Sequence, residues 1–375
     1  MPQLVIATVA VEVPMGAQVY QEEVATRAAG ALSAPAGPAV SPARAGAPTS
    51  PGAGSANAPG DWTVTRAVAR SLRSPLPGTL RLPLSRLGTA SPALRRAAGR
   101  LVYPRGAVVH RVGLELPPHP TRDVVTIQDV VSWRFEDESR PVRAAAEEAR
   151  RAAAVVTVSE FSADEIAELL GVERPHVAYN GVDERYFRTP PLDAAALEAL
   201  GVTGPYVLHA GGASQRKNLE SLAAAWPLIH SARPDLTLVM SGPQNWRRDK
   251  LFGALAGTRL VGRLPDDVMP GLVAGAAVVV VPSHYEGFGL PALEGMAAGV
   301  PVVAARTSSL PEVVGDGGLL VDPTPDEIAQ ATLFALSDDA EVAAMVERGR
   351  ARSADFTWER SAAQHAAVWR SVAAR

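Results

Sequence analysis

Short apolar runs occur in two series along the chain, and stretches with helical periodicity separate them. The runs consist mainly of valine, leucine and alanine without polar alternation, which is typical of strands that helices cover on both faces. They predict strands at 2–9, 124–127, 155–158 and 177–179 in the first series, and at 206–209, 236–240, 259–261, 277–281, 302–304 and 319–321 in the second. Strands and helices in alternation predict an α/β fold of two doubly wound, Rossmann-like domains with parallel sheets.

Helix signals lie within the first series. Residues 142–154 are rich in alanine and charged side chains, which predicts a helix. Ser162 and Glu165 have the spacing of a capping box, and Gly171 provides a stop for the helix that follows. Residues 34–60, by contrast, are rich in alanine, proline, glycine and serine and have no hydrophobic period. We expect a flexible insertion there.

Composition narrows the class of protein. A length of 375 residues suits two domains, and a hydrophobic content of 47% excludes wholesale disorder. The net charge of −3 argues against a nucleic-acid partner, and the lack of cysteine excludes disulfides and Cys-ligated metal sites. Residues 2–9 lack the basic region of a signal peptide, and the longest strongly apolar run, 274–282, is shorter than the ~18 residues of a spanning helix. We therefore expect a cytoplasmic protein.

Basic residues concentrate in one part of the first domain. Residues 61–111 contain ten arginines and a single acid, Asp61. The plain interpretation is a solvated, arginine-rich surface. The alternative is a face for an anionic acceptor or for an acidic membrane, which would make the protein membrane-peripheral.

A basic motif follows the predicted strand 206–209. Gly212 lets the backbone approach a ligand closely, and Asn218 is predicted to cap the next helix. Arg216 and Lys217 then lie near a helix N-terminus, an arrangement that suits a diphosphate. A surface turn with two exposed bases is the alternative. Only two of the 36 basic residues of the chain are lysines, which favours a functional role for Lys217.

An acidic motif follows the strand 277–281. Glu286 is predicted in the loop and Glu294 in the first turn of the next helix, where Pro291 is well placed. Carboxylates accept hydrogen bonds from sugar hydroxyls, and the amides of the loop between them can hold a phosphate. These amides belong to Gly287, Phe288, Gly289 and Leu290. Taken singly, Glu294 could be a helix-stabilising acid and Glu286 an exposed loop acid.

Two other segments give weaker evidence for a nucleotide site. Arg263 and Leu264 follow the strand 259–261 and could line a base pocket, and residues 308–312 form the next strand-to-helix turn. Taken singly, each of them is better explained as a solvated turn, and residues 136–138 are interpreted as a solvated acidic turn. The chain has no phosphate-binding P-loop, no H-E-x-x-H and no D-x-D, so we expect neither a nucleotide triphosphatase nor a metal site.

Taken together, residues 100–375 resemble family 4 glycosyltransferases of GT-B architecture. The matching motifs, in the family's order, are 155–162, Asn180-Gly181-Val182-Asp183, Arg216-Lys217-Asn218 and the Glu286 to Glu294 segment. The tail 358–375 resembles the family's final helix, which returns to the first domain. The resemblance implies an N-terminal acceptor domain at 1–185, completed by that tail, a donor domain at 186–357, and a cleft between them.

The resemblance also implies roles for individual residues. Arg216 and Lys217 match the pair that binds the donor diphosphate, Glu286 the glutamate that faces the transferred sugar, and Glu294 the one that holds the ribose. Gly16 lies where the family has a glycine loop near the diphosphate. The implied reaction is a metal-independent and cofactor-independent transfer, with retention, from a UDP- or GDP-sugar. The implied acceptor is a glycan, a lipid-linked sugar or a small molecule.

One departure leaves alternatives open. Many relatives have His-Asp after the strand 124–127, where this chain has Gln128 and Asp129. Gln128 and Asp129 are candidates for the acceptor side, and His110 is a candidate substitute there, although a core or surface histidine is the better explanation of His110. The departure motivates a non-catalytic nucleotide-sugar binder as an alternative function. Others are an NAD(P)-dependent oxidoreductase, from the spacing Gly287-x-Gly289, and a GT-B phosphorylase or epimerase.

Overall fold

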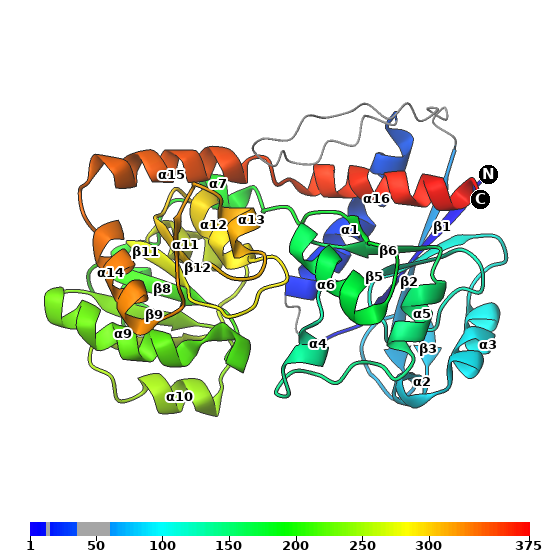
Figure 1. The fold of residues 1–375 in the computed structure, drawn as a ribbon, viewed down its shortest axis with the longest axis horizontal. Helices are drawn as coiled ribbons and strands as arrows, with labels where there is room; N and C mark the ends of the chain where they lie inside the picture. Colours follow the sequence, from blue (N-terminus) through cyan, green and yellow to red (C-terminus); the bar gives the residue numbers. More distant parts are fainter. Residues whose placement is uncertain (13–15, 36–60) are drawn as a thin grey trace. The chain divides into compact units, whose positions relative to one another are not determined.

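The structure, a computed structural model, describes residues 1–12, 16–35 and 61–375 (Figure 1). Most of the predicted insertion, from residue 36 to residue 60, lies outside the described residues. The chain forms two compact units, and each takes one segment from the other's part of the sequence. Unit 1 comprises Met1–Trp133, Arg140–Gly181 and Thr357–Arg375, and unit 2 comprises Arg134–Ser139 and Val182–Phe356.

Unit 1 is built on a seven-stranded parallel sheet with the strand order β3-β2-β1-β4-β5-β6-β7. Its strands are β1 (Gln3–Val9), β2 (Thr63–Ser71), β3 (Leu80–Leu82), β4 (Val108–Arg111), β5 (Asp123–Thr126), β6 (Ala154–Thr157) and β7 (His176–Val177). Its helices are α1 (Gly16–Ser33), α2 (Leu84–Thr89), α3 (Pro92–Val102), α4 (Val131–Arg134, whose last residue belongs to unit 2), α5 (Ala145–Arg151), α6 (Glu160–Leu170) and α16 (Trp358–Ala373). The order is that of a Rossmann-like sheet, as predicted.

The C-terminal helix α16 belongs to unit 1 and packs along α1 (Figure 1). Thr357 caps it by accepting a hydrogen bond from the backbone N–H of Arg360. The helix buries Trp358, His365 and Trp369, and the Trp358 ring lies 6.3 Å from the ring of Tyr20 on α1. Aromatic burial of this kind explains why the tail returns to the first unit.

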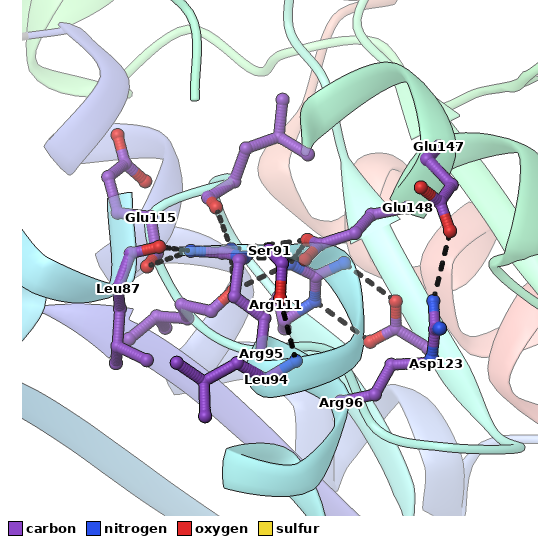
Figure 2. A network of polar contacts seen from close by, with 12 residues as sticks. Leu87, Ser91, Leu94, Arg95, Arg96, Arg111, Glu115, Asp123, Glu147 and Glu148 are labelled. Atoms are coloured by element: carbon purple, nitrogen blue, oxygen red, sulfur yellow. Dashed lines mark hydrogen bonds and ion pairs between the residues drawn. The ribbon is translucent and has the colours of Figure 1, made fainter. Parts of the chain in front are cut away.

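A closed network of charged side chains lies inside unit 1, under α3 (Figure 2). Arg111 on β4 donates two hydrogen bonds to Asp123, at 2.9 and 2.7 Å, and a third to Glu148 at 3.0 Å. Arg95 on α3 pairs with the same Glu148 and also bonds the carbonyls of Leu87, Leu114 and Leu116. All four charged side chains are buried, and each has partners of opposite charge.

Unit 2 is built on a six-stranded parallel sheet with the order β10-β9-β8-β11-β12-β13. Its strands are β8 (Tyr206–Ala210), β9 (Thr237–Ser241), β10 (Thr258–Gly262), β11 (Val278–Val281), β12 (Val302–Ala305) and β13 (Leu319–Val321). Its helical segments are α7 (Arg185–Arg188), α8 (Ala194–Ala199), η1 (Gln215–Lys217), α9 (Leu219–Ala232), α10 (Trp246–Phe252), α11 (Met269–Ala274), α12 (Leu290–Ala297), α13 (Leu310–Val314), α14 (Pro325–Ala335) and α15 (Ala340–Ser353). Helices α9 and α14 cover one face of this sheet, where Trp226 and Ile328 join the main core.

Three local predictions about helix starts were wrong. The cap of α6 is Ser159, which accepts from the N–H of Ser162, so the helix begins before the predicted capping box. Asn218 precedes α9 with φ of 51°, but its side chain bonds the carbonyls of Pro282 and Pro323 instead of capping the helix. Glu294 lies beyond the first turn of α12, which starts at Leu290. For Asn218, tertiary contacts override a local pattern, whereas α6 is capped locally by an earlier serine.

Within the residues described here, no helix has both the length and the apolar composition needed to cross a membrane.

Candidate functional site

The candidate site lies where the strand order of unit 2 reverses. Strands β8 and β11 are neighbours at this switch point, and the chain leaves them in opposite directions around the sheet. Because the strands are parallel, their carboxyl ends meet at the same edge, where doubly wound sheets bind ligands. The loop after β8 carries Arg216 and Lys217, and the loop after β11 carries Glu286.

These three side chains, here called the unit 2 cluster, contact one another directly. The Nζ of Lys217 donates to Oε1 of Glu286 at 2.6 Å, and Nη1 of Arg216 donates to Oε2 at 3.0 Å. Ser283 donates a further hydrogen bond to Oε1 at 2.7 Å. The structure therefore brings the predicted basic pair and the first predicted glutamate together, although 69 residues separate Lys217 from Glu286 in the sequence.

Burial and charge set the ionisation of the cluster. Burial alone would raise the pKa of Glu286, but the Lys217 and Arg216 charges outweigh it and lower this pKa to about 2. Burial lowers the pKa of Lys217, and the Glu286 carboxylate opposes that shift. Glu286 is therefore a buried anion at neutral pH, and the interpretation of Glu286 as an exposed loop acid was wrong.

A second loop holds the backbone of Glu286 in place. Ser308, which has a left-handed φ of 50°, accepts a hydrogen bond from the N–H of Glu286 at 2.9 Å. The buried hydroxyl of Ser309 donates to the carbonyls of Glu286 and Phe288, both at 2.8 Å. A strained residue that is fixed by hydrogen bonds beside a buried carboxylate indicates that the site is preorganised. The interpretation as a solvated turn was wrong for Ser309, which is buried, whereas Ser308 is partly exposed in a turn.

Acidic residues of the 134–139 segment cover the outer side of the cluster. Arg216 donates to Oε1 of Glu138 at 2.8 Å, and the N–H of Gln215 donates to Oδ2 of Asp137 at 2.7 Å. Residues 136–138 form a turn in which Glu136 and Asp137 are exposed, as predicted, whereas Glu138 is partly buried in its ion pair with Arg216. The sequence gives no hint of this contact because 78 residues separate the partners.

Two buried side chains that the sequence analysis did not identify lie beneath the β8 loop. Arg248 donates to the carbonyls of Gly211 and Gly212, the second at 3.3 Å, and so fixes the glycine turn. His209, at the end of β8, donates from Nδ1 to the carbonyl of Val280 at 3.0 Å. Burial lowers the pKa of His209 to about 4, and its Nε2 has no hydrogen-bond partner among the described residues.

Glu294 forms a separate pair with Tyr186 of α7. Burial raises the pKa of Glu294 to about 8, against the hydrogen bond from Tyr186, and the charge of Asp183 raises it further. Burial likewise raises the pKa of the Tyr186 hydroxyl. Tyr186 and Asp183 follow the Asn180-Gly181 turn, so this motif supplies partners for the second predicted glutamate.

Apart from Gly16, which belongs to unit 1, the remaining predicted donor residues follow the carboxyl ends of strands in unit 2. Gly212 has open space where a side chain would project, and Arg263 and Leu264 directly follow β10. Gly287, Gly289 and Leu290 form the turn into α12, whereas the Phe288 side chain is buried against Phe356, with ring centres 5.8 Å apart. Gly16 is exposed at the start of α1 in unit 1, and Met15 lies outside the described residues.

His110 is a core residue of unit 1 and does not reach a surface. His365 donates to the carbonyl of Ser361, so its Nε2 must accept from Tyr20. Tyr20 in turn accepts from Thr126, which accepts from Nε2 of His110, while Trp369 donates to Nδ1. This one-directional chain fixes His110 and His365 as neutral tautomers, and burial lowers both pKa values, that of His365 to about 4.

Gln128 and Asp129, which stand where the family motif has His-Asp, follow β5. The carbonyl of Gln128 accepts from Thr157 at 3.1 Å, and Asp129 accepts from the N–H of Val131 at 3.1 Å. Both side chains are partly exposed. His110 therefore cannot take the place of the missing histidine, whereas Gln128 and Asp129 remain at the carboxyl end of a strand.

Two family models match the chain. The model described as glycosyltransferase family 4 matches residues 84–186, and the model described as glycosyl transferases group 1 matches residues 204–338. The second match contains the loops of the unit 2 cluster.

Individual proteins are similar over more of the chain. O-antigen chain mannosyltransferase B of Escherichia coli is 33% identical over 288 residues, which cover 72% of this chain and 76% of that protein. MMP alpha-(1->4)-mannosyltransferase of Mycolicibacterium hassiacum is 34% identical over 60% of this chain, but the match spans only 56% of its own length.

Solved structures show the same fold. Sucrose-phosphate synthase of Thermosynechococcus elongatus matches with a TM-score of 0.70 and 21% identity over 99% of both chains. HepE of Anabaena, in complex with UDP and glucose, matches with a TM-score of 0.69 and 18% identity over 98% of this chain and 99% of its own.

Proposed function

Because the chain belongs to glycosyltransferase family 4 and has the GT-B fold, we propose that it transfers a sugar from a nucleoside diphosphate sugar to a hydroxyl acceptor, with retention and without a metal ion. In this proposal the donor diphosphate binds Arg216 and Lys217, the sugar lies against Glu286, and the ribose hydroxyls bond Glu294.

One observation carries the proposal. The Lys217 ammonium and the Arg216 guanidinium converge on a single buried carboxylate, at 2.6 and 3.0 Å, at the switch point of the sheet. When a diphosphate leaves a sugar, negative charge grows on its oxygens and positive charge grows on the sugar ring. Fixed cations beside a fixed anion stabilise both charges without reorganisation. The two cations take the neutralising role that a metal ion has in other enzymes.

The ionisation of Glu286 restricts its role. With a pKa of about 2, its carboxylate holds no proton at neutral pH and cannot act as a general acid. It can accept hydrogen bonds from the donor sugar hydroxyls and stabilise positive charge on the ring. Protonation of the leaving group is therefore not part of its role, and Lys217 and Arg216 stabilise the leaving diphosphate by charge.

The nucleotides and nucleotide sugars to be screened for binding are chosen from the names and ligands of the similar proteins. Two of the relatives are mannosyltransferases, and the HepE structure contains UDP and glucose. A thermal-shift screen with GDP, UDP, GDP-mannose and UDP-glucose identifies the donor, since a specific ligand stabilises the folded state. The donor that binds is then used for turnover, with EDTA and with Mg²⁺ as separate conditions and with NMR of the anomeric product.

The test compares Lys217→Ala with Lys250→Ala, a change at the other lysine of the chain, which is exposed on α10. We expect Lys217→Ala to lower transfer and donor hydrolysis by roughly 10²–10³-fold and Lys250→Ala to leave them unchanged. Equal rates in both variants would defeat the proposal. Loss of activity in EDTA that Mg²⁺ restores would defeat its metal-independent form.

The alternatives predict different products. A non-catalytic binder is stabilised by the donor but releases no nucleotide with any acceptor, and a phosphorylase releases sugar phosphate. An oxidoreductase binds NADH, yet five residues separate Val281 from Gly287, where a dinucleotide-binding turn follows its strand at once.

A further inference from the structure

Helix α3 of unit 1 presents two leucines to solvent. The side chain of Leu94 is 59% exposed and that of Leu101 is 89% exposed. Leu94, Ala97 and Leu101 are spaced by three and four residues, so they lie along one side of the helix. Arg96 and Arg100 line the adjacent side, and Arg105 follows the end of the helix. The outer surface of α3 therefore has an apolar side and a basic side next to each other.

The inner side of the helix is locked in place, so the leucines cannot rotate inward. Arg95 projects from α3 into the buried network and bonds Glu148 and the carbonyls of Leu114 and Leu116 (Figure 2). Gly99 packs so closely that a side chain there would collide with the carbonyl of Pro118. Rotation of α3 to bury Leu101 would remove the Arg95 guanidinium from its partners.

Along the chain, the charges next to these leucines are all basic. The sequence has no acidic residue between Asp61 and Glu115. Within the part of the chain that the structure describes, Arg86, Arg100 and Arg105 have no hydrogen-bonded or ion-paired partner for their side chains, whereas Arg96 pairs with Glu147 at 3.1 Å. The exposed leucines thus lie among basic groups that are available to an anionic surface.

We propose that this surface of α3, formed by Leu94, Leu101, Arg100 and Arg105, docks unit 1 on a membrane of anionic lipid. An interfacial helix places apolar side chains among the acyl chains and basic side chains at the headgroups. A soluble polyanion would bind the arginines but would gain nothing from the leucines, so the leucines favour a lipid surface. The inference goes beyond the proposed sugar transfer and does not depend on the unit 2 cluster.

The test is sedimentation of the full-length protein with vesicles of phosphatidylcholine alone and of phosphatidylcholine mixed with phosphatidylglycerol. We expect binding only to the mixed vesicles, weaker at high salt because salt screens the arginines. The double change Leu94→Gln and Leu101→Gln should lower the partition coefficient at least ~10-fold. The double change Arg100→Gln and Arg105→Gln should also lower it ~10-fold or more, since each basic residue contributes roughly five-fold.

Two control variants match these changes. Leu169→Gln alters a leucine of α6 that is 40% exposed but lies beside Glu165 and Glu168 in the sequence, and Arg188→Gln alters an arginine paired with Glu184. Both should bind like the wild type, and thermal unfolding should confirm that the four proteins fold. No binding of the wild type to anionic vesicles would overturn the proposal, and so would equal binding by the leucine variant. Retention on heparin without vesicle binding would indicate a soluble polyanion instead and would also overturn it.

Discussion

Units 1 and 2 each contain two basic and two acidic side chains in direct contact, but the two groups are completed differently. In unit 1 the group is Arg95, Arg111, Asp123 and Glu148, all buried, and backbone carbonyls accept the remaining guanidinium hydrogen bonds. In unit 2 the group is Arg216, Lys217, Glu286 and Glu138, of which Arg216 and Glu138 have side chains that are 20% and 22% exposed.

The difference indicates which charges are structural and which can serve a ligand. The unit 1 charges lie on helices and strands, and each is satisfied inside the protein, so removing one leaves a buried partner with an uncompensated charge. In unit 2, Arg216, Lys217 and Glu286 follow the carboxyl ends of β8 and β11, and Glu138 lies on the 134–139 segment. In the proposed function a phosphate of the donor takes the place of a carboxylate beside the two cations. Similar side chains would then stabilise the fold in one unit and bind a ligand in the other.

The largest effect should come from breaking the unit 1 network. Glu148→Gln leaves Arg95 and Arg111 without a shared anion, and we expect the free energy of unfolding to fall by about 3–5 kcal/mol. Arg96→Gln is the control, because its partly exposed pair with Glu147 should contribute no more than about 1 kcal/mol. Urea unfolding measures both variants, and equal stability would show that the network is not structural.

The next effect should separate binding from turnover in unit 2. Glu286→Gln keeps Arg216 and Lys217 but removes the anion opposite the sugar, so turnover should fall by roughly 10²–10³-fold. Affinity for the nucleoside diphosphate should not weaken, since the carboxylate no longer competes for the cations. Steady-state kinetics and calorimetry measure the two quantities. Weaker nucleotide binding with unchanged turnover would contradict this assignment, in which Arg216 and Lys217 bind the nucleotide and Glu286 promotes turnover.

Glu294 should give a smaller effect that depends on pH. Its pKa is raised from 4.5 to about 8, so over that interval the folded state keeps a proton that the unfolded state loses. Stability must then decrease as the pH rises from 4.5 to about 8. Relative to Glu294→Gln, the wild type should lose stability across this interval and no further above it, as measured by urea unfolding at several pH values. A constant difference would contradict the raised pKa.

Glu286 should show the opposite dependence. Its pKa is lowered from 4.5 to about 2, so the unfolded state holds the extra proton between these values. The stability contributed by the unit 2 cluster is present above pH 4.5 and is lost as the pH falls toward about 2. The Glu286→Gln variant should lack this part of the acid sensitivity in the same series of unfolding measurements.

The smallest effect concerns Glu138. Its partly exposed ion pair with Arg216 should contribute no more than about 1 kcal/mol to the free energy of unfolding. In the proposed function Arg216 binds the donor diphosphate, so Glu138 competes with the donor for this cation. Glu138→Gln should therefore raise nucleotide affinity a few-fold, as measured by calorimetry. A decrease in affinity would mean that Glu138 assists binding.

The sequence predicted most of the strands that are buried on both faces, such as β1, β5 and β11. Apolar runs such as 277–281 alternate with helical segments, which identifies them as strands of a parallel sheet. Because the strands are parallel, the basic and the acidic motif that follow two of them were predicted at the same edge of the sheet. The sequence did not predict β2 or β3. Strand β2 carries two arginines and alternates between exposed and buried positions, and β3 has three residues, so neither forms an apolar run.

The candidate site was predicted in its residue types but not in its contacts. Motif spacing identified Arg216, Lys217 and Glu286. The ion pair of Arg216 with Glu138, and the hydrogen bonds of Ser308 and Ser309 to the Glu286 backbone, join segments that are distant in the sequence. His110 was assigned to the acceptor side only as a candidate, and its hydrogen-bond chain to Trp369 of α16 gives it a place in the core. Single-sequence patterns carry no information about such long-range pairs.

Calorimetric titration of the wild type and of Lys217→Met with UDP and with GDP shows whether the buried ammonium of Lys217 binds the nucleotide. We expect the wild type to bind one of the two nucleotides, and the loss of the ammonium to weaken binding about 10–100-fold, as expected for a charge-assisted hydrogen bond. Equal affinity in the two proteins, or no binding of either nucleotide by the wild type, would contradict this expectation.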